Sequence, residues 1–224
     1  MRFAILSDLH DNLVGFYRVL ADIEQQHIDQ LVYLGDAGRD PQIFSELQQR
    51  GVACVFGNWE VSGLRRLPTA LVGWVGAWPA TLQMNHSIFC HATPHMPLTV
   101  TTTTAAAQHI AAGSSWAALF PRLNFNEQAR WDALATLEAA DLRVAFHGHT
   151  HIQMVWVWQA DQAGRRQLRS FTEPFEFTLE AGPSTAPTRY LIGVGSAGQP
   201  DDGPALSYAI YDELTHVVTL RKLA

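Results

Sequence analysis

The sequence contains little cysteine and no long hydrophobic run. Cys54 and Cys90 are its only cysteines, and each lies in an apolar stretch, which favours buried, reduced thiols over a disulfide. The longest apolar stretch, 71–82, is interrupted by glycine and proline and is too short to span a bilayer. The apolar run near the N-terminus is too brief for a signal peptide. We therefore expect a cytoplasmic protein that does not associate with membranes.

Positive charge is scarce as well. The chain has 15 lysines and arginines against 21 aspartates and glutamates, which gives a formal net charge of -6. This balance disfavours a sequence-independent grip on nucleic acid, so a nuclease is the weaker alternative and nucleic acid is not an expected partner. With 47% hydrophobic residues the chain can bury a core, and its length fits a single domain over 1–224. The oligomeric state is left open.

Short apolar runs and amphipathic stripes alternate along the first part of the chain. Continuous apolar runs are typical of strands that are buried on both faces. An apolar stripe over 16–23 predicts a helix, Asp40 and Pro41 predict the start of a second one, and 127–140 predicts a third. This alternation predicts an α/β protein with parallel crossovers. The expected strands lie at 3–6, 31–34, 52–56 and 87–90 and in the stretch that leads into His147.

The pattern changes after His151. The remaining apolar segments are short and are separated by turn residues, which is typical of hairpins. We therefore expect these segments to form a second, antiparallel sheet. They lie at 154–158, 171–179, 190–194, 207–211 and 217–222.

Side chains that can bind a metal follow each of the five expected strands. Neutral imidazole is the commonest nitrogen ligand of transition metals, and ligands of such sheets gather at the carboxyl ends of the strands. Each residue alone has a plain structural explanation, such as a turn or a cap. Together they offer enough oxygen and nitrogen atoms for two metals with one shared carboxylate. The set is Asp8, His10, Asp36, Asn58, His91, His149 and His151.

These residues form a recognisable series of motifs. In order, the series resembles the five motifs of the calcineurin-like metallophosphoesterases, above all their small bacterial and archaeal members of the phosphodiesterase-like branch. The resemblance spans 1–151 and returns at 195–200. It implies a two-sheet β-sandwich flanked by helices. The motifs are Asp8-x-His10, Gly35-Asp36, Gly57-Asn58, His91 and Gly148-His149-Thr150-His151.

The resemblance also implies how the metals are held. One ion is expected on Asp8, His10 and His151. The other is expected on Asn58, His91 and His149, with Asp36 bridging both. The implied enzyme is a phosphatase or phosphodiesterase in which two divalent ions activate water, with Asp36, Asn58 and His149 as catalytic residues. Manganese is the favoured metal, with iron, zinc, nickel and cobalt as alternatives, and the expected substrate is a small phosphorylated molecule, with nucleotides among the candidates.

One departure from the family pattern concerns Trp59. Many members have a histidine there that is thought to protonate the leaving group, and an indole cannot do so. The alternative to an enzyme is therefore a metal-binding regulatory protein, or a weakly active member that lost this acid. His95 is a candidate stand-in for the proton donor. Arg39, Arg65 and Arg66 are candidates for phosphate binding, against the simpler interpretation of solvated surface charges.

The segment 94–125 is longer than a simple crossover needs. It combines prolines, a threonine run and a possible helix over 108–120. We interpret it as a small lid insertion over the metal edge, because ordered insertions of this length are usually functional. The alternative is a surface helix that simply packs against the body of the domain.

Overall fold

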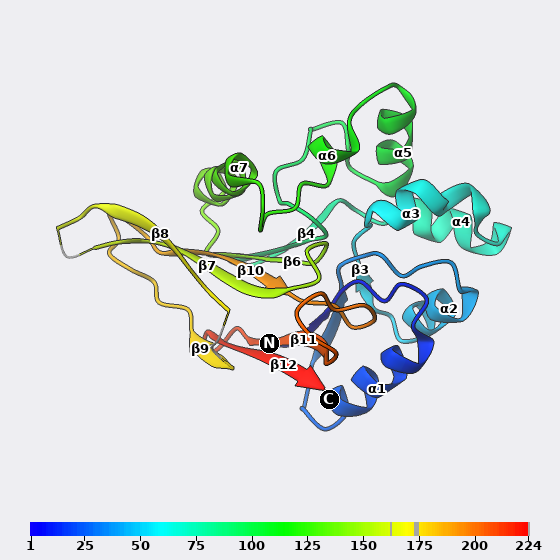
Figure 1. Cartoon of the computed structure of the whole chain (residues 1–224), viewed down its shortest axis with the longest axis horizontal. Coiled ribbons are helices and arrows are strands. Elements are labelled where there is room, and N and C mark those ends of the chain that lie inside the picture. The colour runs from blue at the N-terminus through cyan, green and yellow to red at the C-terminus, as the bar shows by residue number, and fades with distance from the viewer. Residues whose placement is uncertain (162, 173–174, 224) are drawn as a thin grey trace.

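The computed structural model describes residues 1–161, 163–172 and 175–223. Two six-stranded sheets lie face to face, and helices cover their outer faces (Figure 1). Helices α1 and α2 lie beside the first sheet, at the right of the view, and α7 lies above the second sheet (Figure 1). This α/β architecture of two sheets flanked by helices confirms the fold class predicted from the sequence.

The first sheet contains the N-terminal strands. Its order is β3-β2-β1-β11-β12-β9, in which β1, β2 and β3 are parallel and the remaining neighbours are antiparallel. The helices α1 (Leu13–Ile23) and α2 (Pro41–Gln49) form the crossovers, and the Asn12 and Asp40 side chains cap them as N-cap residues. The strands are β1 (Arg2–Leu6), β2 (Gln30–Tyr33), β3 (Ala53–Cys54), β9 (Glu176–Thr178), β11 (Leu206–Asp212) and β12 (Val217–Leu223).

The second sheet has the order β4-β5-β6-β10-β7-β8. Strands β5, β6 and β10 are parallel, and β4, β7 and β8 pair in the antiparallel sense. The strands are β4 (Thr81–Met84), β5 (Ser87–Cys90), β6 (Val144–His147), β7 (Gln153–Ala160), β8 (Arg166–Phe171) and β10 (Arg189–Val194). The remaining helices are α3 (Asn58–Gly63), η1 (Leu64–Arg66), α4 (Thr69–Gly76), α5 (Thr103–Ala111), α6 (Trp116–Leu119) and α7 (Glu127–Ala139).

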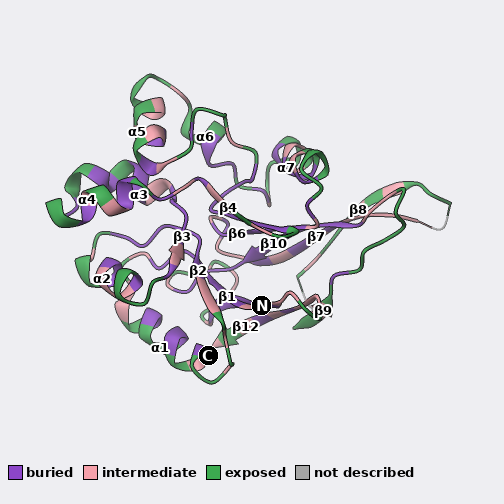
Figure 2. Ribbon diagram, turned by 180° about the vertical axis from the view of Figure 1, so that it is seen from behind, coloured by how far each residue is buried: buried purple, intermediate pink, exposed green. Residues whose placement is uncertain are grey.

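The core is divided between the inner and outer faces of the sheets. Strand β1 shows why: Phe3 and Ile5 pack between the two sheets, whereas Ala4 and Leu6 pack against the helices. Side chains alternate along a strand, so a strand that is buried on both faces must be apolar throughout. Buried residues accordingly run along the central strands of both sheets (Figure 2).

The strands after His151 depart from the prediction of a separate antiparallel sheet. Strands β9, β11 and β12 join the first sheet, whereas β7, β8 and β10 join the second, where β10 is parallel to β6. The physical reason is that β1 and β6 would otherwise be open edges with unpaired backbone groups. The strand expected at 171–179 is divided between β8 and β9, and its residues 173–174 lie outside the described residues.

The prediction of a single helix over 108–120 is also wrong. Helix α5 ends at Ala111 and α6 begins at Trp116, with Gly113 between them at a φ of 100°. A left-handed glycine does not continue a right-handed helix. The segment is joined to the body of the domain, because Leu119 and Phe120 are buried in the core with α3 and α4. Its role as a lid stays a prediction.

Membrane insertion of a helix finds no support in the structure. Within 1–161, 163–172 and 175–223, no helix combines the length and the apolar character that crossing a bilayer requires.

Candidate metal centre

The loops that follow β1, β2 and β6 share an unusual backbone conformation. Asp8, Asp36 and His149 have φ values of 57°, 62° and 62°. Residues other than glycine rarely adopt positive φ values, and those that do concentrate at functional sites. The loops are tied together, since the Asp8 N–H donates to the Gly35 carbonyl at 3.0 Å and the Gly148 N–H donates to the His91 carbonyl at 2.8 Å. The polar side chains therefore meet at one edge of both sheets.

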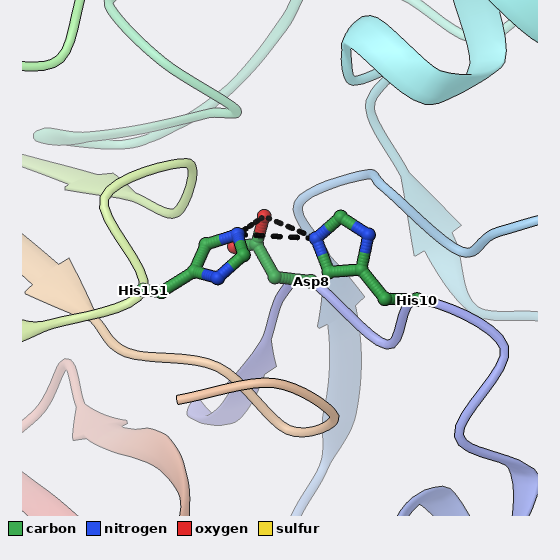
Figure 3. A group of neighbouring side chains, drawn as sticks. All are labelled: Asp8, His10 and His151. Carbon is green, nitrogen blue, oxygen red and sulfur yellow. Dashed lines mark hydrogen bonds and ion pairs between the residues drawn. The ribbon is translucent and has the colours of Figure 1, made fainter. Parts of the chain in front are cut away.

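The first group of potential ligands consists of Asp8, His10 and His151 (Figure 3). The Nε2 atoms of His10 and His151 are 3.1 Å apart. The Asp8 Oδ1 atom lies 3.2 Å from Nε2 of His151 and 3.7 Å from Nε2 of His10. Residues 143 positions apart in the chain thus turn three donor atoms toward a common point.

The second group consists of Asp36, His91 and His149. His91 Nε2 lies 3.5 Å from Asp36 Oδ2 and 3.1 Å from Asn58 Oδ1, so the asparagine oxygen belongs to the same cluster. Asp36 Oδ2 is also 3.9 Å from Nε2 of His10 in the first group. The Asp36 carboxylate therefore lies between the two groups, where one side chain can reach both.

The donor set fits divalent cations. Asp8 and Asp36 are buried, and Asp8 Oδ1 has no hydrogen-bond partner in the described part of the chain. Burial and the nearby charges of Glu60 and Asp8 raise the pKa of Asp36 well above its usual value, a cost that a bound cation removes. Burial lowers the pKa of His91 to about 3, so this imidazole is neutral and keeps a lone pair for a metal.

Backbone carbonyls orient the imidazole rings. His91 Nδ1 lies 2.8 Å from the Leu34 carbonyl, His149 Nε2 lies 3.0 Å from the Phe120 carbonyl, and His151 Nδ1 lies 2.7 Å from the Gln199 carbonyl. In each ring one nitrogen is thereby engaged as a donor and the other is left as a potential ligand atom. Partners of this kind fix the tautomer and raise ligand basicity in metalloproteins.

Glu60 supports the loops from below and was not singled out by the sequence. Its carboxylate is buried and accepts three backbone N–H bonds: Ala37 at 2.8 Å, Asp36 at 2.9 Å and Gly57 at 2.7 Å. These bonds join the loop after β2 to the loop after β3. Both carboxylate oxygens of Glu60 are occupied by backbone N–H groups. We therefore assign Glu60 the role of positioning the Asp36 loop.

We expect Glu60→Gln to lower the free energy of unfolding by about 2 kcal/mol, because the amide group would face an N–H donor and leave it unpaired. Urea unfolding of the metal-loaded protein measures this change. Glu24→Gln is the matched control, since the Glu24 side chain is 68% exposed and its ion pair with Arg50 is 3.8 Å long. An exposed change of this kind is expected to stay within about 0.5 kcal/mol. Equal stability of the two variants would contradict the role of Glu60.

A cleft of about 330 Å³ opens above the two groups. Five of the seven predicted ligands line it, and Asp8 and His91 lie beneath them in the protein. Sequence analysis missed Arg122, Gln199 and Asp201. Gln199 falls in the second family-like segment, but no strand end or motif points to Arg122. The full lining is His10, Asp36, Asn58, Trp59, Arg122, His149, His151, Gln199 and Asp201.

The other predicted substrate residues lie elsewhere. Arg39 lies over the Trp59 ring, with its guanidinium carbon 5.5 Å from the ring centroid, but does not line the cleft. Arg65 and Arg66 line a separate pocket against α5, because α3 and η1 carry them away from the metal edge. His95 lines a third pocket, where its Nδ1 lies 3.1 Å from Thr136 Oγ1. Their substrate roles stay predictions.

His147 lies outside both groups. It is buried, its Nδ1 lies 3.0 Å from the Gly148 carbonyl, and burial lowers its pKa to about 4. This ring is therefore neutral and enclosed, and it offers no donor atom to either group.

Comparisons with known proteins agree with this geometry. Residues 1–216 match the family model of the calcineurin-like phosphoesterase superfamily domain. The chain belongs to this superfamily. The members of this superfamily are phosphoesterases, which supports the assignment of this chain to the hydrolases. They typically bind divalent metal ions.

Two solved structures share the fold of this superfamily member. A metallophosphoesterase from Sphaerobacter thermophilus is 20% identical, with a TM-score of 0.72 over 100% of this chain and 89% of that chain. An archaeal phosphodiesterase is 13% identical, with a TM-score of 0.50 over 100% of both chains. No curated protein sequence gives a significant match. At these identities the likeness concerns the fold alone.

Proposed function

We propose that this protein is a dinuclear metal-dependent phosphoester hydrolase. The observation that supports this most is the position of Asp36 between two donor groups, within reach of His91 at 3.5 Å and of His10 at 3.9 Å. Asp8, His10 and His151 would hold one ion, and Asn58, His91 and His149 would hold the other. A cleft above them leaves room for a small phosphorylated substrate, with nucleotides among the candidates.

The chain's own residues divide the work of binding and orientation. A pair of divalent ions supplies Lewis acidity and lowers the pKa of bound water. Asp36 would hold both ions at a fixed separation, while Asn58 contributes an uncharged oxygen beside His91. Manganese is the favoured metal, and iron, zinc, nickel and cobalt suit the same mixture of imidazole, carboxylate and amide ligands. Trp59 forms an apolar wall of the cleft, with its ring 4.9 Å from that of His10.

A metal-reconstituted activity screen tests this proposal. The metal-free protein is loaded with each candidate metal and assayed on an aryl phosphomonoester, an aryl phosphodiester and a phosphoanhydride. We expect turnover that depends on the metal and disappears in His91→Ala. Absence of turnover with every metal would reject the enzyme and favour the alternative, a metal-binding regulatory protein that lost its leaving-group acid at Trp59.

A further inference from the structure

The cleft contains one cationic side chain that the metal groups do not explain. Arg122 belongs to the segment 94–125, in the connection between α6 and α7, and its side chain lines the cleft. Its Nη2 atom donates to the Thr150 carbonyl at 3.3 Å, and Thr150 stands between the two histidines of different metal groups. The Phe125 ring lies under the guanidinium, 5.9 Å from its central carbon. The backbone and this ring therefore hold Arg122 beside both donor groups.

The charge of Arg122 is balanced by an exposed acid. Nη2 of Arg122 lies 3.0 Å from Asp201 Oδ2, and the two side chains are 44% and 47% exposed. Asp201 is itself anchored, because its backbone N–H donates to the His151 carbonyl at 3.0 Å. Exposed ion pairs are weak and exchange readily with other partners. The guanidinium is thus available to an anion that enters the cleft and binds it more tightly than the Asp201 carboxylate does.

We propose that Arg122 binds a non-bridging phosphoryl oxygen of the substrate, and that Asp201 occupies this position while the cleft is empty. The inference rests on the proposed hydrolase function and names its substrate class: compounds with a terminal phosphoryl group, that is, phosphomonoesters, in preference to phosphodiesters.

Charge and oxygen count support this preference. A monoester carries close to two negative charges near pH 7 and offers three non-bridging oxygens, whereas a diester carries one charge and offers two. A monoester therefore has one more non-bridging oxygen and about one more negative charge to offer to Arg122 than a diester has. The planar guanidinium suits such an oxyanion because it can donate two parallel N–H bonds. A diester, with one oxygen and one charge fewer, gains little from the cation.

The neighbouring arginines do not offer the same contact. Arg39 lies over the Trp59 ring without lining the cleft, and Arg65 and Arg66 line another pocket. Arg122 is therefore the one arginine that lines this cleft among the residues that the structure describes.

The test compares Arg122→Gln and Asp201→Asn with the wild type in the metal-loaded protein. Arg122→Gln is expected to raise KM for an aryl phosphomonoester about ten- to a hundredfold and to leave KM for an aryl phosphodiester within about twofold, on the scale of one hydrogen bond to a charged group. Asp201→Asn is expected to change KM in the opposite direction, lowering it for the monoester about threefold by removing the competitor. Arg166→Gln is the matched control, because it removes a partly exposed arginine of β8 that is paired at 2.7 Å with Glu138 and does not line the cleft.

Calorimetric titration provides a second measurement that does not depend on turnover. Inorganic phosphate is expected to bind Arg122→Gln at least about tenfold more weakly than the wild type, whereas dimethyl phosphate is expected to bind both equally. If the wild type hydrolyses phosphoesters but both substrates and both ligands respond alike to Arg122→Gln, the inference about Arg122 fails while the enzyme stands. If the wild type hydrolyses nothing, the proposed function fails, and the titration alone decides whether Arg122 binds phosphate.

Discussion

Asp36→Asn is expected to abolish most activity and to reduce the metal content from about two ions per chain to about one. The asparagine keeps the oxygen that accepts the Trp59 N–H bond, which is 2.8 Å long in the native protein. It replaces Oδ2, the atom that faces His91 and His10, with an uncharged amide nitrogen that cannot bind a cation. The expected loss in kcat is about a thousandfold, the scale of removing one preorganised electrostatic group.

Elemental analysis of the purified variant measures the metal content, and turnover of an aryl phosphate measures the activity. The fold is expected to persist, because the change is isosteric and removes a buried negative charge next to Glu60. Asp132→Asn is the control, since Asp132 Oδ1 accepts an exposed hydrogen bond from Gln128 of α7 and does not line the cleft. Two ions per chain with full activity in Asp36→Asn would remove the bridging role from our proposal.

Hydrolysis is expected to depend steeply on the acidity of the leaving group. General acid help is typically worth about a hundred- to ten-thousandfold, and Trp59 stands where many members of the family have the histidine that is thought to donate the proton. Within the described residues, the cleft histidines His10, His149 and His151 all belong to the two metal groups, and the carboxylate of Asp201, which also lines the cleft, is paired with Arg122 at 3.0 Å. Aryl phosphates and phosphoanhydrides should therefore be good substrates, and alkyl phosphates should be poor ones.

The slope of log kcat against leaving-group pKa measures this dependence. Trp59→His is expected to flatten the slope, helping alkyl substrates by up to about a hundredfold and aryl substrates little. Trp59 is half-buried and contacts His10 and Arg39, so circular dichroism and metal content must show an intact variant first. Trp59→Phe is the control, since it changes the ring and adds no acid. A shallow slope in the wild type would mean that another group already supplies the proton.

His95 becomes a weaker candidate for that proton in this structure. Its ring lies in a pocket with α7 residues, bonded to Thr136, and it does not line the metal cleft. The sequence placed it four residues after His91, but in the fold its side chain lines a separate pocket with residues of α7. Separation along the sequence is thus a poor guide to direction once a strand has ended.

The sequence by itself determined which strand ends meet. An apolar run must be buried, and parallel strands with crossover helices bring their carboxyl ends to one edge. Asp8 after β1 and Asp36 after β2 could therefore be expected as neighbours, whereas His91 follows β5 of the second sheet and joins them only through the packing of the two sheets. Helix starts were equally local, because the Asp40 side chain caps α2 through the Gln42 N–H at 2.9 Å.

Tertiary packing alone decided the remaining features. Which edge strand accepts β10 or β11 depends on backbone pairing between distant segments, which local patterns do not encode. The same holds for Arg122: it reaches the cleft because Leu119 and Phe120 are buried in the core and fix the connection to α7. The three hydrogen bonds that the Glu60 carboxylate accepts from backbone N–H groups likewise form only when the loops after β2 and β3 lie together. The sequence was enough to identify the candidate metal ligands. The hydrogen-bond partners that orient these side chains come from distant parts of the chain, so only the tertiary structure reveals them.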